Sequence, residues 1–129
     1  MKLSTYKVLI VDDNPTFVKT LGILIKSVLG EKLILLDEAY NGQQAVEKVF
    51  NKNKYNVIFM DVNMPEMDGI TATKLLNREL YRETRIVAVS FNKDFNILNK
   101  MIEAGACNYL LKDNLTIESL EHVFEVTIL

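Results

Sequence analysis

The chain has 129 residues, of which 49% are hydrophobic, enough for one domain to bury a core without disulfide bonds. Its 15 basic and 17 acidic residues give a net charge of −2, which provides neither a basic surface for nucleic acid nor a polybasic membrane anchor. The single cysteine, Cys107, excludes an internal disulfide and a CxxC metal site, and we expect it to be a small core residue. The apolar runs are too short to span a membrane and no signal-peptide pattern is present, so we expect a cytoplasmic protein.

Short, wholly apolar runs recur along the chain, and a segment with helical spacing follows each of them. Such continuous runs are typical of strands that are covered on both faces, as in a parallel sheet. The five predicted strands are Val8–Val11, Leu33–Leu36, Val57–Met60, Ile86–Val89 and Tyr109–Leu111.

The helical segments also carry end signals. Asn14 and Pro15 suit the N-cap and first turn of the first helix, Asp68 can cap the third, and Gly105 closes the fourth. Alternation of five strands and five helices predicts an α/β fold in three layers, a doubly wound (βα)5 sheet within one domain over residues 1–129. The positions predicted to face the core are Phe17, Leu21, Leu24 and Val28; Ala45, Val46, Val49 and Phe50; Ile70, Thr73 and Leu75 or Leu76; Phe95, Leu98, Met101 and Ile102; and Ile117, Leu120 and Phe124.

Polar residues follow each of the five apolar runs, although Asp37 and Glu38, after the second run, contribute less to the expected site. Asp12 and Asp13 follow the first run, Asp61 the third, Ser90 the fourth and Lys112 the fifth. Because the carboxyl ends of parallel strands meet at one edge of the sheet, where ligands bind in open α/β folds, we expect these side chains to converge. A single aspartate could serve as a helix cap, and a lone serine or lysine could be an ordinary surface residue. The combination indicates a functional site.

Three converging carboxylates would raise one another's pKa unless a cation joined them. Carboxylate oxygens completed by water suit Mg²⁺. The first strand-to-helix turn, residues 12–15, has no glycine or hydroxyl to cradle a phosphate, which argues against a flavin- or dinucleotide-binding domain. The sequence therefore predicts a magnesium site.

These residues resemble the receiver domains of bacterial two-component response regulators. The resemblance covers essentially the whole chain and rests on the Asp12-Asp13 pair, the block from Asp61 to Gly69, and the positions of Ser90, Tyr109 and Lys112. It implies a flavodoxin-like fold, and it implies that residues 1–129 form a receiver domain.

The resemblance also implies a site chemistry. Asp61 would be the nucleophile that takes a phosphoryl group from a sensor histidine kinase or phosphotransfer protein, forming an acyl phosphate. Asp13, Asp61 and the main-chain carbonyl of Asn63 would bind Mg²⁺ directly, and Asp12 would hold it through water.

Lys112 would pair with the phosphoryl oxygens, and the Ser90 hydroxyl would bond to one of them. Ser90 would then move toward the phosphate and Tyr109 inward behind it, changing the surface of helix 4, strand 5 and helix 5. That surface would control an output domain or partner, or form a homodimer. The chain would be a phosphoacceptor, with at most slow self-dephosphorylation, rather than an enzyme, and it would bind no nucleic acid directly.

The sequence departs from the family at two positions. Asp113 follows Lys112 where many relatives have proline; a cis bond there would cost about 2.5–4 kcal/mol, so the geometry of this bond stays open. The Lys112-Asp113 pair resembles that of regulators with a DNA-binding output domain, and the apolar end at residues 126–129 favours a chain that continues.

The second departure is Phe91, which stands where a small residue is usual. We expect it either to narrow the path of water to the phosphoryl group or to pack against Phe95.

Three alternative functions share part of this pattern. A phosphatase of the haloacid dehalogenase type shares the aspartyl phosphate, but its nucleophile follows its first strand and it needs a cap. A flavodoxin-like electron carrier conflicts with the acidic first loop. A binding module that needs no phosphorylation conflicts with the complete site. His122 is expected to be a helix surface residue rather than a phosphodonor.

Overall fold

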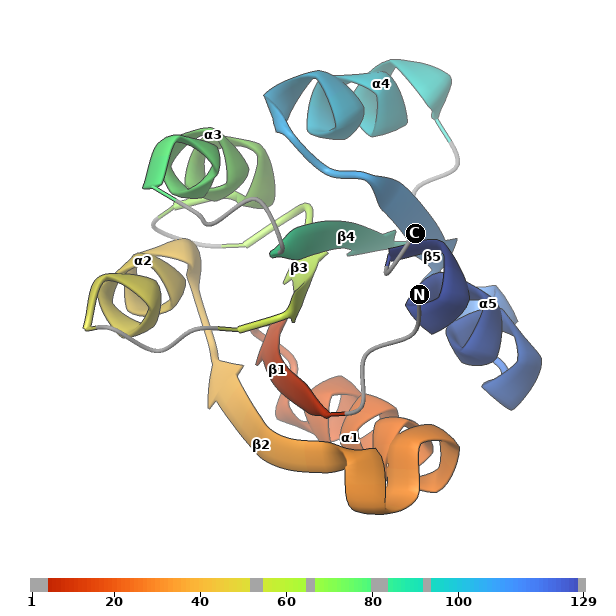
Figure 1. Ribbon diagram of the computed structural model, residues 1–129. Coiled ribbons are helices and arrows are strands. Elements are labelled where there is room, and N and C mark those ends of the chain that lie inside the picture. The colour runs from red at the N-terminus through yellow and green to blue at the C-terminus, as the bar shows by residue number, and fades with distance from the viewer. Residues whose placement is uncertain (1–4, 52–54, 65–66, 80–83, 92–93, 128–129) are drawn as a thin grey trace.

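A computed structural model describes residues 5–51, 55–64, 67–79, 84–91 and 94–127. Five parallel strands form one sheet in the order β2-β1-β3-β4-β5, and helices connect them (Figure 1). This confirms the predicted flavodoxin-like (βα)5 fold. The elements are β1 Tyr6–Val11, α1 Pro15–Leu29, β2 Leu33–Ala39, α2 Gly42–Phe50, β3 Val57–Asp61, α3 Gly69–Glu79, β4 Arg85–Ser90, α4 Phe95–Ala104, β5 Asn108–Leu111 and α5 Ile117–Thr127, with short 3-10 turns at Gly30–Lys32 and Lys112–Asn114.

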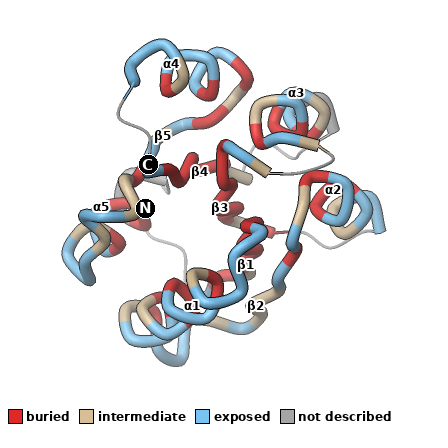
Figure 2. Tube along the Cα trace, turned by 180° about the vertical axis from the view of Figure 1, so that it is seen from behind, coloured by how far each residue is buried: buried red, intermediate tan, exposed pale blue. Residues whose placement is uncertain are grey.

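Helices cover both faces of the sheet. Helices α1 and α5 contact each other on one face, while α2, α3 and α4 pack in sequence on the other (Figure 1). Successive strand residues point to opposite faces, so Val8 and Ile10 enter the α1/α5 core, whereas Leu9 and Val11 enter the α2/α3/α4 core. The buried residues are concentrated on the central strands and on the inner sides of the helices (Figure 2). This double burial explains the continuous apolar runs.

The helix ends follow the predicted signals. Asn14 caps α1 by accepting the amide hydrogens of Thr16 and Phe17, with Pro15 in the first turn. Asp68 accepts the amide of Thr71 at 2.8 Å, and Gly105 ends α4 at a φ of 132°. Among the described residues, no helix is both long and apolar enough to cross a membrane.

The predicted core was wrong at several helix positions. In α1 the buried positions are Val18, Leu21, Gly22, Ile25 and Leu29. Of the predicted positions, Leu21 is among them, whereas Phe17, Leu24 and Val28 are only partly buried and pack against the same core. Four other positions that were predicted to face the core are exposed, namely Phe50, Phe95, Ile102 and Ile117. Apolar spacing marks the buried side of a helix but not how far its neighbours extend over it.

Cys107 was also predicted to be a core residue, and it is exposed. It lies in the turn between α4 and β5, and the adjacent Ala106 takes the buried position. Strand β2 lies at an edge of the sheet, which leaves Ile34 exposed despite its apolar run.

Candidate functional site

The carboxyl edge of the sheet brings the predicted residues together through strand register. Val11 is paired with Met60, so the residues that follow them, Asp12 and Asp61, are neighbours across β1 and β3. Ser90 ends β4 and is paired with Leu111 of β5, directly before Lys112. Four segments far apart in the sequence therefore supply one small region.

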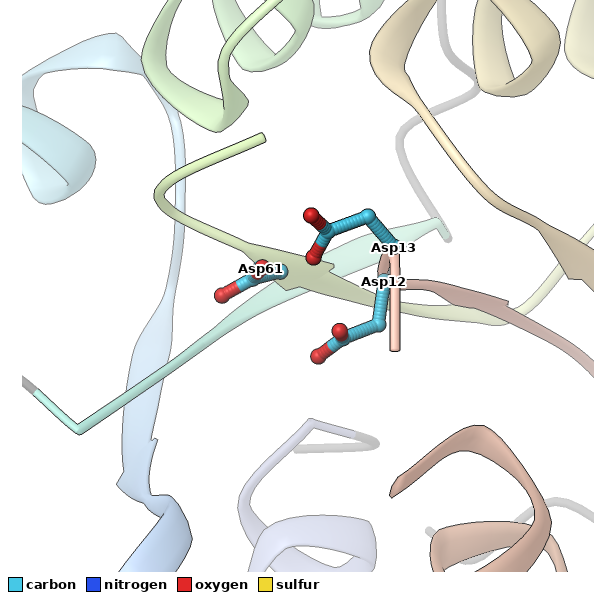
Figure 3. Close-up of side chains that lie close together, drawn as sticks. All are labelled: Asp12, Asp13 and Asp61. Atoms are coloured by element: carbon cyan, nitrogen blue, oxygen red, sulfur yellow. The ribbon is translucent and has the colours of Figure 1, made fainter. Parts of the chain in front are cut away.

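Asp12, Asp13 and Asp61 form a carboxylate cluster. One oxygen of each lies within 4.8 Å of the others, and the three side chains converge in Figure 3. Asp12 and Asp61 are only 1% and 6% exposed, whereas Asp13 is open to solvent. Asp12 is fixed by the amide of Asn14, which donates to its Oδ1 at 2.9 Å. These are hard oxygen donors with one solvent-facing member, a set suited to a small divalent cation.

Lys112 is the cation of the site. Its Nζ lies 2.6 Å from Asp12 Oδ2 and 3.4 Å from Asp61 Oδ1, and its side chain is nearly buried. The same Nζ is 4.5 Å from the centre of the Phe17 ring and 5.3 Å from that of Phe91. The ammonium is therefore held between two carboxylates and two aromatic rings.

The charge balance around Asp61 disfavours its ionised form. Burial, followed by the neighbouring Asp12 charge, raises the pKa of Asp61 from 3.8 to about 6, although Lys112 opposes the rise. One ammonium thus does not compensate three carboxylates. A second positive charge would stabilise this cluster.

The start of α3 lies close to the end of β3 at Asp61. The amide of Gly69 donates to the carbonyl of Val62 at 2.8 Å, and a Cβ at Gly69 would lie 2.0 Å from the Asp61 carbonyl oxygen. Only glycine allows this approach. Gly69 was noted in sequence only as part of the 61–69 block, and its steric role appears in the structure.

The remaining predicted residues have clear positions. Ser90 is buried at the end of β4, and Asn63 is exposed in the loop after β3. Tyr109 is 40% exposed on β5. The Lys112–Asp113 peptide bond is trans, which answers the question left open by the missing proline.

Two phenylalanines contact Lys112, which the sequence did not predict. Phe91 is 65% exposed and faces Lys112, while Phe95, its expected neighbour, is 73% exposed. Phe17 was predicted only as a core residue of the first helix, yet its half-buried ring also contacts Lys112. The available signal was its spacing, one helical turn after the acidic pair, which places it beside the strand ends.

Comparisons with known proteins agree with this architecture. The family model described as the response regulator receiver domain matches residues 8–124. Among curated relatives, the transcriptional regulatory protein YdfI of Bacillus subtilis is 35% identical over 122 residues, covering 95% of this chain and 54% of that protein. The signal transduction histidine-protein kinase BarA of Shigella flexneri is 35% identical over 106 residues, covering 81% of this chain and 11% of that protein. The chain thus spans about half of the first relative and a small part of the second.

A solved structure is similar over nearly its whole length. The receiver domain of the sensor histidine kinase PA1611 from Pseudomonas aeruginosa PAO1 superposes with a TM-score of 0.81 at 25% identity, covering 96% of this chain and 98% of that one. Its description records a magnesium ion coordinated in the active site cleft of that protein. With the family model matching most of the chain, this chain belongs to the response regulator receiver domains of two-component signalling systems.

Proposed function

We propose that this chain is a phosphorylation-dependent switch that accepts a phosphoryl group on Asp61 from a sensor histidine kinase or phosphotransfer protein. The observation that carries the proposal is the convergence of the three carboxylates with Lys112 at the carboxyl edge of the sheet. Membership of the receiver family supports a histidine kinase as the general kind of partner. We place this activity in the cytoplasm, where the kinase's phosphorylated domain would meet it.

The residues fit a bound Mg²⁺ ion. Asp13 and Asp61, with the main-chain carbonyl of Asn63, would hold it directly. Both oxygens of Asp12 already have protein partners, Asn14 and Lys112, which supports contact through water for this residue. When bound, the ion would supply positive charge to the phosphoryl oxygens.

The transfer step needs positioned charge more than covalent help from the protein. An Asp61 carboxylate oxygen forms a bond to phosphorus while the P–N bond to the donor imidazole breaks, and its electron pair returns to that nitrogen. Lys112 would neutralise charge on the equatorial oxygens, and the Ser90 hydroxyl would donate a hydrogen bond to one of them. The same groups would permit slow loss of the phosphoryl group to water, so the chain would act as a phosphoacceptor rather than as an enzyme with many turnovers.

The response would appear on the surface of α4, β5 and α5. Ser90 would move toward the phosphoryl group and Tyr109 would leave its exposed position and turn inward. This surface carries exposed apolar side chains, Phe95, Ile102, Tyr109 and Ile117, that an output domain, a partner or a second copy could cover. The nearly balanced charge of the chain favours control of such a partner over direct binding to nucleic acid.

Phosphorylation by acetyl phosphate tests the proposal. In the presence of Mg²⁺, intact-protein mass spectrometry should show one added phosphoryl group that hydroxylamine removes, as expected of an acyl phosphate. Asp61→Asn should abolish the addition, whereas Asp113→Asn, which removes an exposed carboxylate next to Lys112, should retain it. Modification that persists in Asp61→Asn would place the acceptor elsewhere.

A further inference from the structure

Two phenyl rings contact the Lys112 ammonium from separate parts of the fold. Phe17 belongs to the first turn of α1, and Phe91 follows β4. Their ring centres lie 4.5 and 5.3 Å from Lys112 Nζ, within the distance at which a cation is attracted to the face of an aromatic ring. Phe17 is half-buried and Phe91 is exposed.

The rings matter because the flexible side chain of Lys112 does not by itself fix the position of the ammonium. Lysine is a point charge on a flexible four-carbon stem, unlike the rigid fork of arginine. In the described structure the carboxylates of Asp12 and Asp61 attract its ammonium. When a cation and a phosphoryl group engage these two carboxylates, as proposed above, their attraction for the ammonium falls. The attraction of the ring faces does not depend on the carboxylates.

We propose that Phe17 and Phe91 form an aromatic clamp that positions the Lys112 ammonium beside Asp61 for phosphoryl transfer. The inference rests on the proposed function and adds two positioning residues to it. The clamp acts through Lys112, because electrostatic stabilisation depends on charge being in place before the reaction begins. Phe17 is the more informative of the two residues, since Phe91 is also expected to narrow the path of water to the phosphoryl group.

Matched substitutions separate the ring face from apolar bulk. Phe17→Leu and Phe91→Leu keep an apolar side chain without the ring, whereas Phe17→Tyr keeps the ring. With saturating Mg²⁺, the rate of phosphorylation by acetyl phosphate should fall about threefold to tenfold in each leucine variant and stay near the wild-type rate in Phe17→Tyr. Phe91 is exposed, so its leucine variant tests the clamp even if the Phe17 variant is poorly folded.

A second readout needs no phosphorylation. Ring faces shield nearby protons, so the Lys112 ammonium resonance in ¹H–¹⁵N spectra of the Mg²⁺-free protein should move downfield in both leucine variants and not in Phe17→Tyr. Unchanged rates and unchanged resonances in the leucine variants would overturn the clamp alone. A wild-type protein that takes up no phosphoryl group would overturn the proposed function and with it this role, whatever the spectra show.

Discussion

At the scale of single residues, Asp61 has an unfavourable charge in the folded protein. Its pKa is raised to about 6 because the carboxyl group is buried next to Asp12, whereas the unfolded chain would titrate near 3.8. The folded state therefore binds the proton more tightly than the unfolded state. It follows that stability falls as the pH rises from about 4 to 6 and stays reduced at higher pH.

Asp61→Asn should remove this penalty. Without divalent cations at pH 7, we expect the variant to unfold with a free energy about 1–3 kcal/mol higher than the wild type, because each pKa unit corresponds to about 1.4 kcal/mol. At pH 4 the difference should largely disappear, since Asp61 is then mostly protonated. Urea denaturation with EDTA, followed by circular dichroism, measures both values. Equal stabilities at pH 7 would show that the Asp61 charge is tolerated at no cost.

Phe91 provides a second test at this scale. We expect its exposed ring, which lies beside Lys112, to narrow the path of water to a phosphoryl group on Asp61, so a smaller side chain should speed hydrolysis. The informative comparison is Phe91→Ala against Phe91→Leu, because neither has a ring to contact Lys112 and they differ mainly in bulk. A steric barrier of about 1 kcal/mol corresponds to roughly fivefold faster decay in the alanine variant. Equal lifetimes of the two phosphorylated proteins would exclude a gate.

At the scale of elements, the close approach of Gly69, at the start of α3, to the end of β3 supports the position of Asp61. Gly69→Ala would place a methyl group 2.0 Å from the Asp61 carbonyl oxygen, so the end of β3 or the start of α3 must shift. We expect a loss of about 1–3 kcal/mol in stability and slower phosphorylation by acetyl phosphate.

Gly22→Ala is the matched control for this substitution. The same added methyl would meet the ends of the Leu36 and Ile10 side chains, at 3.5 and 4.0 Å, within a helix that alanine favours. The two variants should therefore differ in their free energy of unfolding, measured by urea denaturation, and in their rate of phosphorylation by acetyl phosphate. A Gly69→Ala protein that matches Gly22→Ala in both measurements would contradict the steric role.

The elements themselves could be predicted from sequence because burial on both faces produces apolar runs and helix ends carry local signals. Asn14, Pro15, Asp68 and Gly105 act through contacts within a few residues, which a sequence displays directly. The exposure of Cys107, like that of the helix residues wrongly predicted to be buried, depends instead on whether neighbouring elements cover the side chain. Sequence spacing contains no such information.

The same distinction holds for the site. Parallel strands of fixed order must end at one edge, so the convergence of Asp12, Asp61 and Lys112 followed from their positions at strand ends. The contact of Phe17 with Lys112 could not be predicted, because the two residues are far apart in the sequence and spacing within a helix does not show which distant residue a side chain will meet. This contact depends on the tertiary arrangement that brings α1 close to Lys112.

At the scale of the whole molecule, the carboxylate cluster joins β1 to β3 and, through Lys112, to the end of β5. An ion bound only by the folded state stabilises the entire domain by mass action. We therefore expect Mg²⁺ at a hundred times its dissociation constant to stabilise the wild type by about 2.7 kcal/mol. This should appear as a higher Tm at constant ionic strength.

Asp13→Ala should remove most of this Mg²⁺ dependence while leaving the Tm in EDTA unchanged or slightly higher. Asp13 is exposed and Asn14 is the cap of α1, so little stability is lost with the side chain. Its charge also contributes to the raised pKa of Asp61, and its removal lessens that repulsion. Calorimetry suits the measurement because the chain has no tryptophan to report binding by fluorescence. Glu31→Ala, which removes an equal charge before β2 and away from the cluster, should respond to Mg²⁺ like the wild type. If Asp13→Ala kept the full Mg²⁺ response, Asp13 would not be a ligand of the ion.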